Sequence, residues 1–304
     1  MKILVMGAGA VGAYFGARLQ QAGERVVFCA RGENLRALRD HGLTVASYQG
    51  DFTLQVDATD DPRERAPYDL ILFCVKSYDT GNVASALAGC LTHGGKVLTL
   101  QNGVENEAAL AEVFGRGAVL GGNARIGAEM VAPGHLAHHT GGHIEFGELD
   151  GEVTPIAREI AAMFERAGIF GELTARLGTI RWEKLLWNGA FNSVTALARC
   201  NVGTVIDDVD GAALIRALMG EIVAVAQAEG VALDERDIEA QMTRSERHLR
   251  EVRTSTLQDS ERRKPLEFEA LSGAVVRAAR RHGFSAPRVE TVYALLRLLD
   301  GASR

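Results

Sequence analysis

Three polar residues recur at intervals of four in the second half of the chain: Lys184, Asn188 and Asn192. Four residues turn an α-helix by about 400°, so this spacing predicts that the three side chains form one polar row. Trp, Leu and Phe residues flank the row. An ammonium and two amides suit a polar substrate, and an ammonium is a competent general acid where a carbonyl oxygen gathers charge during hydride transfer. The alternative is a solvated lysine beside two surface amides.

A glycine-rich turn lies near the N-terminus. Gly7-Ala8-Gly9-Ala10-Val11-Gly12 satisfies G-x-G-x-x-G between an expected strand and an expected helix. In this motif the first glycine allows a tight turn, the second lets the backbone approach a pyrophosphate, and the third allows close helix packing. The helix N-terminus adds N–H donors. The turn therefore predicts a dinucleotide site, the alternative being a βα turn without a ligand. The expected cofactor-binding residues are Gly7, Ala8, Gly9, Ala10, Val11 and Gly12.

The charge that follows the second expected strand indicates which dinucleotide is bound. That strand ends in Arg31 and not in the acidic residue that would hold the ribose 2′-hydroxyl of NAD. A guanidinium can pair with a 2′-phosphate and stack on adenine, which favours NADPH. Lys76, just past the strand that ends at Val75, would add a second positive charge at the same edge. The alternative for both residues is a solvated cation.

Three further residues are candidates. Asn102 lies between an expected strand and an expected helix, where open α/β folds bind ligands, so it either faces nicotinamide or substrate or caps the helix. Ser255 and Glu267 stand either side of Pro265, where a new helix is expected to begin. A carboxylate at a helix start is favoured by the dipole alone, so Glu267 has a plain structural alternative.

The pattern of elements predicts two domains. The first half alternates β-branched runs with helical stretches, as in a parallel sheet built from βαβ units. We expect strands at 2–6, 25–30, 70–74, 96–99 and 118–121, antiparallel strands within 125–147, and helices at 10–21, 34–41, 80–90, 104–114 and 155–167. Long helices follow at 180–198, 211–229, 234–258, 266–282 and 288–299. This predicts an α/β Rossmann domain over 1–168 and an all-α substrate and catalytic domain over 169–304.

Composition excludes several classes of protein. Apolar residues make up 47% and charged residues 24% of 304 residues, which is typical of globular proteins and excludes disorder. A net charge of -6 argues against bulk attraction to nucleic acid or anionic membranes. Apolar runs fall far short of the roughly 20 residues that span a bilayer, and the N-terminus does not read as a signal peptide. We therefore expect a cytoplasmic protein.

Cysteines and histidines give no sign of a metal site. The four cysteines lie far apart without a C-x-x-C pair, so we expect buried free thiols, no disulfide and no zinc. Four histidines lie close together in an expected hairpin without a Cys or carboxylate to complete a site, and strand alternation sends His138 and His139 to opposite faces. We interpret them as exposed hairpin histidines: His135, His138, His139 and His143.

Together these residues resemble the ketopantoate reductases (2-dehydropantoate 2-reductases), over nearly the whole chain. The resemblance rests on the glycine turn, Ala30-Arg31-Gly32, Val75-Lys76, Gln101-Asn102-Gly103, the row at Lys184, Asn188 and Asn192, and the stretch from Ser255 to Glu267. The chain departs from the family in having Asn192-Ser193-Val194-Thr195 for Asn-Pro-Leu-Thr, and Lys264-Pro265-Leu266-Glu267 for the commoner Arg-Thr-Glu pattern.

The resemblance implies a role for each candidate. Lys184 would be the general acid, and Glu267 would orient Lys184 or a substrate hydroxyl. Asn102 would lie near the nicotinamide, and Arg31 with Lys76 would receive the 2′-phosphate. The residues that would hold substrate are Asn188, Asn192 and Ser255. The helical domain would be of the 6-phosphogluconate dehydrogenase C-terminal-like class.

The expected activity is NADPH-dependent reduction of ketopantoate to pantoate, a step toward pantothenate and coenzyme A. We expect a small 2-oxo acid as partner, no nucleic acid or membrane, and a homodimer as a candidate assembly. One alternative is a reductase of another 2-oxo acid on the same scaffold. Another is a noncatalytic NADPH sensor, against which the joint presence of Lys184 and Glu267 speaks, because cofactor binding alone needs neither.

Overall fold

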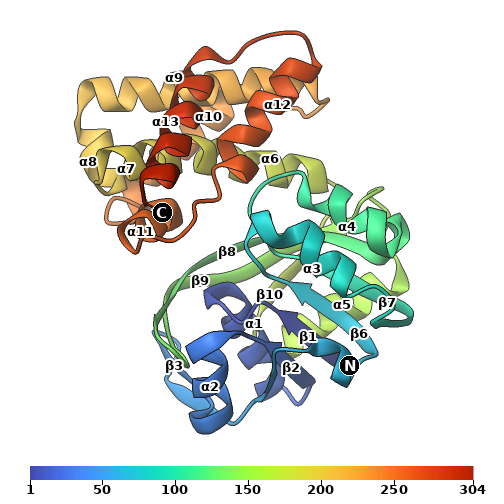
Figure 1. Cartoon of the computed structure of the whole chain (residues 1–304). Coiled ribbons are helices and arrows are strands. Elements are labelled where there is room, and N and C mark those ends of the chain that lie inside the picture. Colours follow the sequence, from blue (N-terminus) through green and yellow to red (C-terminus); the bar gives the residue numbers. More distant parts are fainter. Residues whose placement is uncertain (304) are drawn as a thin grey trace. The chain divides into compact units, whose positions relative to one another are not determined.

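The computed structural model describes residues 1–303 and divides into two compact units (Figure 1). The first contains residues 1–101 and 106–177, and the second contains residues 102–105 together with the chain from 178 onward. The first unit is an α/β domain and the second is helical, so the predicted fold class is confirmed.

The first unit is built on a ten-stranded sheet within the described residues, in the order β4-β3-β9-β8-β7-β6-β1-β2-β5, with β10 also pairing with β9. All neighbours from β8 to β5 in this order pair in parallel, whereas β8 with β9 and β3 with β4 pair antiparallel. The strands are β1 (Lys2–Met6), β2 (Arg25–Cys29), β3 (Leu43–Ser47), β4 (Phe52–Leu54), β5 (Asp57–Thr59), β6 (Tyr68–Phe73), β7 (Leu91–Thr99), β8 (Val119–Ala132), β9 (His135–Glu148) and β10 (Phe170–Leu173).

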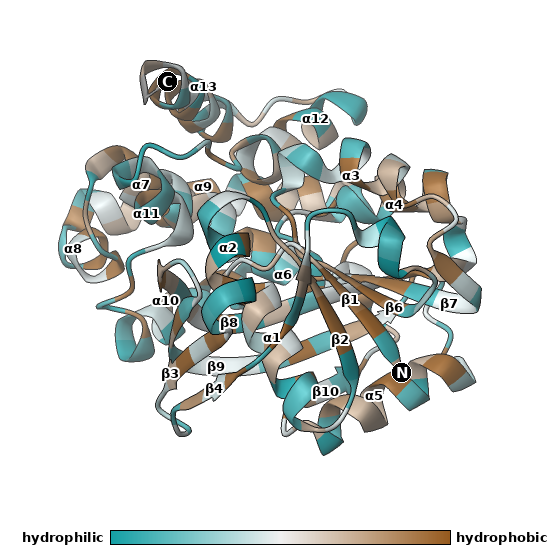
Figure 2. Ribbon diagram, turned by 60° about the horizontal axis from the view of Figure 1, so that its bottom comes forward, coloured by the Kyte–Doolittle hydropathy of each residue, from teal (hydrophilic) through white to brown (hydrophobic). Residues whose placement is uncertain are grey.

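Alternate residues of the central strands enter two separate apolar cores. Ile3 and Val5 pack with the α1 and α5 side, whereas Leu4 and Met6 pack with the α3 and α4 side. A strand buried on both faces is apolar over most of its length, as the brown colour along most of β1 and β6 shows in Figure 2. The helices of this unit are α1 (Ala10–Gln21), α2 (Gly32–His41), α3 (Thr80–Ala86), α4 (Asn106–Phe114) and α5 (Pro155–Arg166), with short 3-10 turns η1 (Pro62–Arg65), η2 (Ser77–Asp79) and η3 (Arg116–Ala118).

The expected antiparallel region is one long hairpin. Strand β8 starts in parallel register with β7 and continues antiparallel to β9, with register shifts after Arg125, Gly127 and Met130 (Figure 1). The outer side of β9 pairs with β3 at one end and with β10 at the other. Because β10 follows residue 168 and extends this sheet, the first unit continues past the expected end of the Rossmann domain.

The second unit packs around helix α9, which contacts α8, α10, α12, α13 and η4. Its buried side includes Ile215, Leu218, Ile222 and Val225. The helices are α6 (Leu177–Trp187), α7 (Ser193–Ala198), α8 (Val202–Asp207), α9 (Val209–Ala228), α10 (Glu235–His248), α11 (Ser255–Glu261), α12 (Ala274–Arg281) and α13 (Pro287–Ser303), and two π-helical segments are η4 (Asn188–Asn192) and η5 (Glu269–Gly273).

The predicted bounds of three helices in this unit are partly wrong. The helix expected at 180–198 is interrupted by η4. The helix expected at 234–258 ends at His248, because the chain then turns to accept backbone hydrogen bonds from the start of α8. Pro265 does not begin a helix: residues 264–267 are non-helical, and Leu266 and Phe268 are buried in an apolar cluster with Leu296 of α13.

A buried ion pair ties β7 to the end of β9. The Lys96 ammonium lies 3.0 Å from both carboxylate oxygens of Glu148 and donates to the Gly117 carbonyl at 2.6 Å. The side chains of Lys96 and Glu148 are only 8% and 5% exposed. Thr154 donates a further hydrogen bond to Glu148, so the carboxylate is well satisfied.

We predict that Lys96→Met lowers the free energy of unfolding by about 3–5 kcal/mol, because it leaves the Glu148 carboxylate buried without its cation. Urea denaturation followed by far-UV circular dichroism measures the change. The double variant Lys96→Met/Glu148→Leu is expected to recover most of the loss. A double variant as unstable as the single one would show that the unpaired charge is not the cause.

Candidate functional site

The three glycines of the N-terminal turn meet three different physical demands. Gly7 has a φ of +100°, and a Cβ there would lie 2.9 Å from the backbone of Cys74. A Cβ at Gly12 would lie 2.3 Å from the Gly7 carbonyl oxygen. At Gly9, the N-cap of α1, a Cβ would have no heavy atom within 4 Å. The turn is therefore open at Gly9, beside the unpaired N–H groups of the helix, and it fits an anionic pyrophosphate.

The peptide groups of this turn are fixed on both sides. The Ala8 N–H donates to the Cys29 carbonyl at 2.9 Å. The Asn34 amide nitrogen donates to the Ala8 carbonyl at 2.9 Å, and the Asn34 amide oxygen accepts from the Gly134 N–H at 2.9 Å. Asn34 thus links α2, the glycine turn and the tip of the β8–β9 hairpin. Sequence reasoning missed it, because an Asn inside a helix gives no signal of a contact with Gly134.

The two expected phosphate-binding cations follow strands on opposite sides of β1. Arg31 follows β2 as the exposed N-cap residue of α2, and Lys76 follows β6 as the half-buried N-cap residue of η2. Strands β2 and β6 are the two neighbours of β1, whose carboxyl end leads into the glycine turn. The sheet therefore places both cations at its carboxyl edge, either side of the turn.

A buried amide holds the segment that contains Lys76. Gln101 donates to the Val75 carbonyl at 2.9 Å and to the Thr80 hydroxyl at 2.8 Å, and accepts from the Thr99 hydroxyl at 3.0 Å. Gln101 is 5% exposed. Its place beside Asn102 in the sequence was visible. Its three partners lie just after β6, at the start of α3 and at the end of β7, and they follow only from the fold.

Cys74, which precedes this segment, is an ordinary thiol. Burial raises the pKa of Cys74 to about 12 and that of Cys29 to about 11, so neither is a thiolate at neutral pH. Cys29 and Cys90 are buried, whereas Cys74 and Cys200 are only half-buried, which corrects the expectation of four buried thiols. No thiol chemistry is indicated at this edge of the sheet.

Asn102 does not cap the helix that follows it, because α4 begins only at Asn106. The segment 102–105 belongs instead to the helical unit. Arg181 donates to the Gly103 carbonyl, and the Arg277 guanidinium lies 2.7 Å from the Glu105 carboxylate. Asn102 is half-buried. It therefore joins the unit that also contains the predicted polar row.

The three residues of the predicted polar row do not lie on one continuous α-helix. Lys184 is half-buried on α6, while Asn188 begins and Asn192 ends the π segment η4. Asn188 is 8% exposed and Asn192 is 2% exposed, so the alternative of two surface amides is wrong. The Oδ1 atom of Asn192 has no hydrogen-bond partner within residues 1–303. An unsatisfied buried acceptor is costly, and π segments occur frequently at functional sites.

The remaining two candidates lie beside elements that contact η4. Ser255 is exposed at the start of α11, next to Thr254, whose hydroxyl lies 2.8 Å from that of Thr195. Glu267 is 7% exposed in the non-helical stretch before η5. It is therefore not the exposed N-terminal charge of a helix. Both α11 and η5 contact η4, so the second unit gathers these candidates around one π segment.

The hairpin histidines separate as expected, but one of them is buried. His138 is 2% exposed between the rings of Tyr14 and Tyr48, and its Nδ1 lies 2.9 Å from the Ser47 hydroxyl. Burial lowers the pKa of His138, so its neutral form is favoured. His139 is exposed near Glu129. The interpretation as exposed hairpin histidines is therefore wrong for His138, because α1, which carries Tyr14, packs against that face of β9.

Comparison with known proteins covers almost the whole chain. Residues 3–151 match the family model described as ketopantoate reductase PanE/ApbA, and residues 176–300 match its C-terminal counterpart. A 2-dehydropantoate 2-reductase from Halobacterium salinarum is 35% identical to this chain, and the match covers 98% of each protein. A 2-dehydropantoate 2-reductase from Nostoc is 30% identical, and the match covers 100% of this chain and 96% of the Nostoc protein.

Solved structures agree with this match. A 2-dehydropantoate 2-reductase from Geobacter metallireducens superposes with a TM-score of 0.93 at 35% identity, covering 98% of this chain and 99% of that one. A D-mandelate dehydrogenase solved with NADH and anilino(oxo)acetate has a TM-score of 0.94 at 20% identity. The superposition covers 100% of this chain and 99% of that one, which shows the shared fold. Among the described residues, no helix has the length and apolar character to cross a membrane.

We predict that Asn192→Leu leaves the free energy of unfolding unchanged or raises it by about 1 kcal/mol, because it removes a buried acceptor that has no partner. The matched control is Asn201→Leu, which removes an N-cap that accepts from the Thr204 N–H and is expected to cost about 1 kcal/mol. Thermal or urea unfolding measures both. If Asn192→Leu is as destabilising as the control, the amide has a structural role.

Proposed function

The chain belongs to the ketopantoate reductase family, and from this premise we propose that it reduces 2-dehydropantoate to pantoate with NADPH, using Lys184 as general acid. The observation that supports the proposal best is the match to reductases of this name over nearly the full chain. The buried π segment that carries Asn188 and Asn192 gives the polar row a setting suited to a small polar substrate.

The glycine turn would hold the cofactor pyrophosphate at the open side of Gly9, where the N–H groups at the start of α1 are available. Arg31 and Lys76 would take the 2′-phosphate, with Arg31 forming a charge-assisted pair. When bound, NADPH supplies a hydride. The protein's own contribution is to bind and orient the partners and to manage the proton.

Lys184 would stabilise the charge that develops on the ketone oxygen as C2 accepts the hydride, and its Nζ would then donate the proton that completes the hydroxyl. Glu267 would orient Lys184 or a substrate hydroxyl from its buried position. Asn188, Asn192 and Ser255 would hold the substrate. Asn102 would lie near the nicotinamide, carried by a segment that belongs to the same unit.

A reductase of another 2-oxo acid is the second candidate, because Ser193-Val194 stands where many relatives have Pro-Leu, directly after Asn192. A noncatalytic sensor is the third. A homodimer is the assembly we propose, in line with the dimeric ketopantoate reductase described from Staphylococcus aureus. Size-exclusion chromatography with light scattering tests the assembly.

The activity is tested by following NADPH oxidation with a panel of 2-oxo acids that includes ketopantoate. The proposal expects ketopantoate to have the highest kcat/KM of the panel. A higher value for a different 2-oxo acid would establish the second candidate, and NADPH binding without turnover of any panel member would establish the sensor.

We predict that Arg31→Ala weakens NADPH binding by about ten- to a hundredfold and NADH binding far less. A charge-assisted hydrogen bond to the phosphate contributes roughly 1.5–3 kcal/mol. Fluorescence titration with each cofactor measures the dissociation constants. Arg36→Ala, which removes an exposed arginine from the same helix, is the control. Equal loss with both cofactors would contradict the assignment of Arg31.

We predict that Lys184→Ala lowers kcat by roughly 10²–10⁴ with ketopantoate, because the reaction loses its proton donor. NADPH affinity and melting temperature are expected to stay near the wild-type values. Lys184→Arg keeps the charge but holds its proton too tightly, so it is expected to bind substrate and remain slow. Turnover within a few-fold of wild type in Lys184→Ala would mean that the proton comes from another group.

A further inference from the structure

The carboxyl ends of β2 and β5 place two acidic residues beside Arg31. The strands pair in parallel with Cys29 opposite Thr59, and the Ala30 N–H donates to the Thr59 carbonyl at 3.1 Å. Asp60 follows Thr59 directly, and Arg31 follows Ala30, two residues after Cys29. Paired strands lie about 4.8 Å apart, so these side chains start from neighbouring backbone positions.

The electrostatics of the Cys29 thiol agree with this placement. Burial is the main cause of its raised pKa, but Arg31 acts to lower it, and Asp60 and Asp61 act to raise it. The Cys29 sulfur therefore feels one cation and two carboxylates. If Arg31 receives a phosphate, Asp60 and Asp61 are two negative charges at the same carboxyl edge of β2 and β5.

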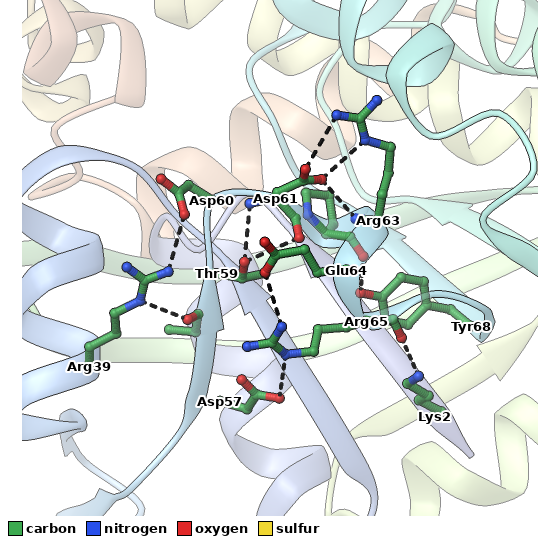
Figure 3. A network of polar contacts seen from close by, with 12 residues as sticks. Lys2, Arg39, Asp57, Thr59, Asp60, Asp61, Arg63, Glu64, Arg65 and Tyr68 are labelled. Carbon is green, nitrogen blue, oxygen red and sulfur yellow. Dashed lines mark hydrogen bonds and ion pairs between the residues drawn. The ribbon is translucent and has the colours of Figure 1, made fainter.

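Each carboxylate is held by an arginine, as Figure 3 shows. Arg63 pairs with Asp61 at 3.1 Å, and Asp61 also accepts from the Arg63 backbone N–H as the N-cap of η1. Arg39 of α2 places Nη2 3.1 Å from the Asp60 carboxylate and Nε 3.0 Å from the Ala58 carbonyl. The Arg39 guanidinium is thus fixed to the β5 backbone while it holds Asp60.

Asp60 and Asp61 have different structural roles. Asp61 has a local role as a helix cap. Asp60 has its ion pair with Arg39, and both side chains are largely exposed, at 64% and 48%. An exposed pair of this kind adds little to stability, typically about 0.2–1 kcal/mol, so a contribution to folding does not by itself account for the arrangement.

We propose that Arg39 is a specificity-determining residue for the 2′-phosphate of the cofactor, acting by holding Asp60 away from Arg31. This inference rests on the proposed use of NADPH. Without Arg39, the Asp60 carboxylate repels the phosphate and competes with it for the Arg31 guanidinium. NADH, which has no 2′-phosphate, is not subject to either effect.

The test is a double-mutant cycle read as the ratio of kcat/KM for NADPH to that for NADH, with ketopantoate as substrate at low ionic strength, where exposed charges are least screened. Arg39→Met is expected to lower the ratio about three- to fivefold, through the NADPH value. Asp60→Asn is expected to keep or raise the ratio. In the Asp60→Asn background, adding Arg39→Met is expected to change the ratio less than twofold.

The matched control is Arg216→Met, which breaks an Arg–Glu pair of similar distance and exposure on the helical unit and is expected to leave the ratio unchanged. The proposal is overturned if Arg39→Met leaves the ratio unchanged, or if it lowers the ratio equally in the Asp60→Asn background. In the second case Arg39 acts directly and not through Asp60. Failure of the proposed NADPH use is recognised separately, because Arg31→Ala would then not alter the ratio either.

Discussion

Helix α1 lies so close to the sheet that two of its positions accept no side chain. A Cβ at Gly12 would lie 2.3 Å from the Gly7 carbonyl oxygen, and one at Gly16 would lie 2.6 Å from both Phe28 and Val5. This close packing fixes the angle at which the chain leaves β1, and with it the direction of the helix N-terminus. The cations after β2 and β6, and the Asn34 contact to Ala8, are arranged around that one turn. Sequence reasoning identified Gly12 but missed Gly16, because the motif ends before it.

The helical unit buries polar groups around its two π segments. Asn192 is buried with an unsatisfied oxygen in η4, and Glu267 is buried beside η5, the second π segment, which contacts the first. A π turn is rarer than an α turn and inserts an extra residue, which redirects the side chains that follow. Buried polar groups and irregular helix geometry in the same place are the physical pattern expected where a fold keeps function at the expense of stability.

The central strands of the α/β half were predictable because each signal was local, whereas the short strands β3, β4, β5 and β10 were not predicted. Strand β1 and helix α1 were expected at their observed bounds, since Ile3 to Met6 form an apolar run and a glycine turn marks its end. The π segments were not predictable, because an interval of four residues looks the same whether the backbone is α or π. The Pro265 prediction failed for a different reason. Burial of Leu266 and Phe268 against α13 outweighed the tendency of proline to start a helix.

The edge of the sheet at β5 has a consequence for how the protein behaves at high concentration. Carbonyl groups alternate in direction along a strand, and since the Thr59 carbonyl faces β2, the Ala58 carbonyl faces outward. An outward carbonyl on an edge strand invites pairing with another molecule, which is a route to aggregation. Here the Arg39 guanidinium occupies that carbonyl, and the strand is only three residues long. A charged side chain from α2 thus keeps this edge from serving as a template for intermolecular β-sheet.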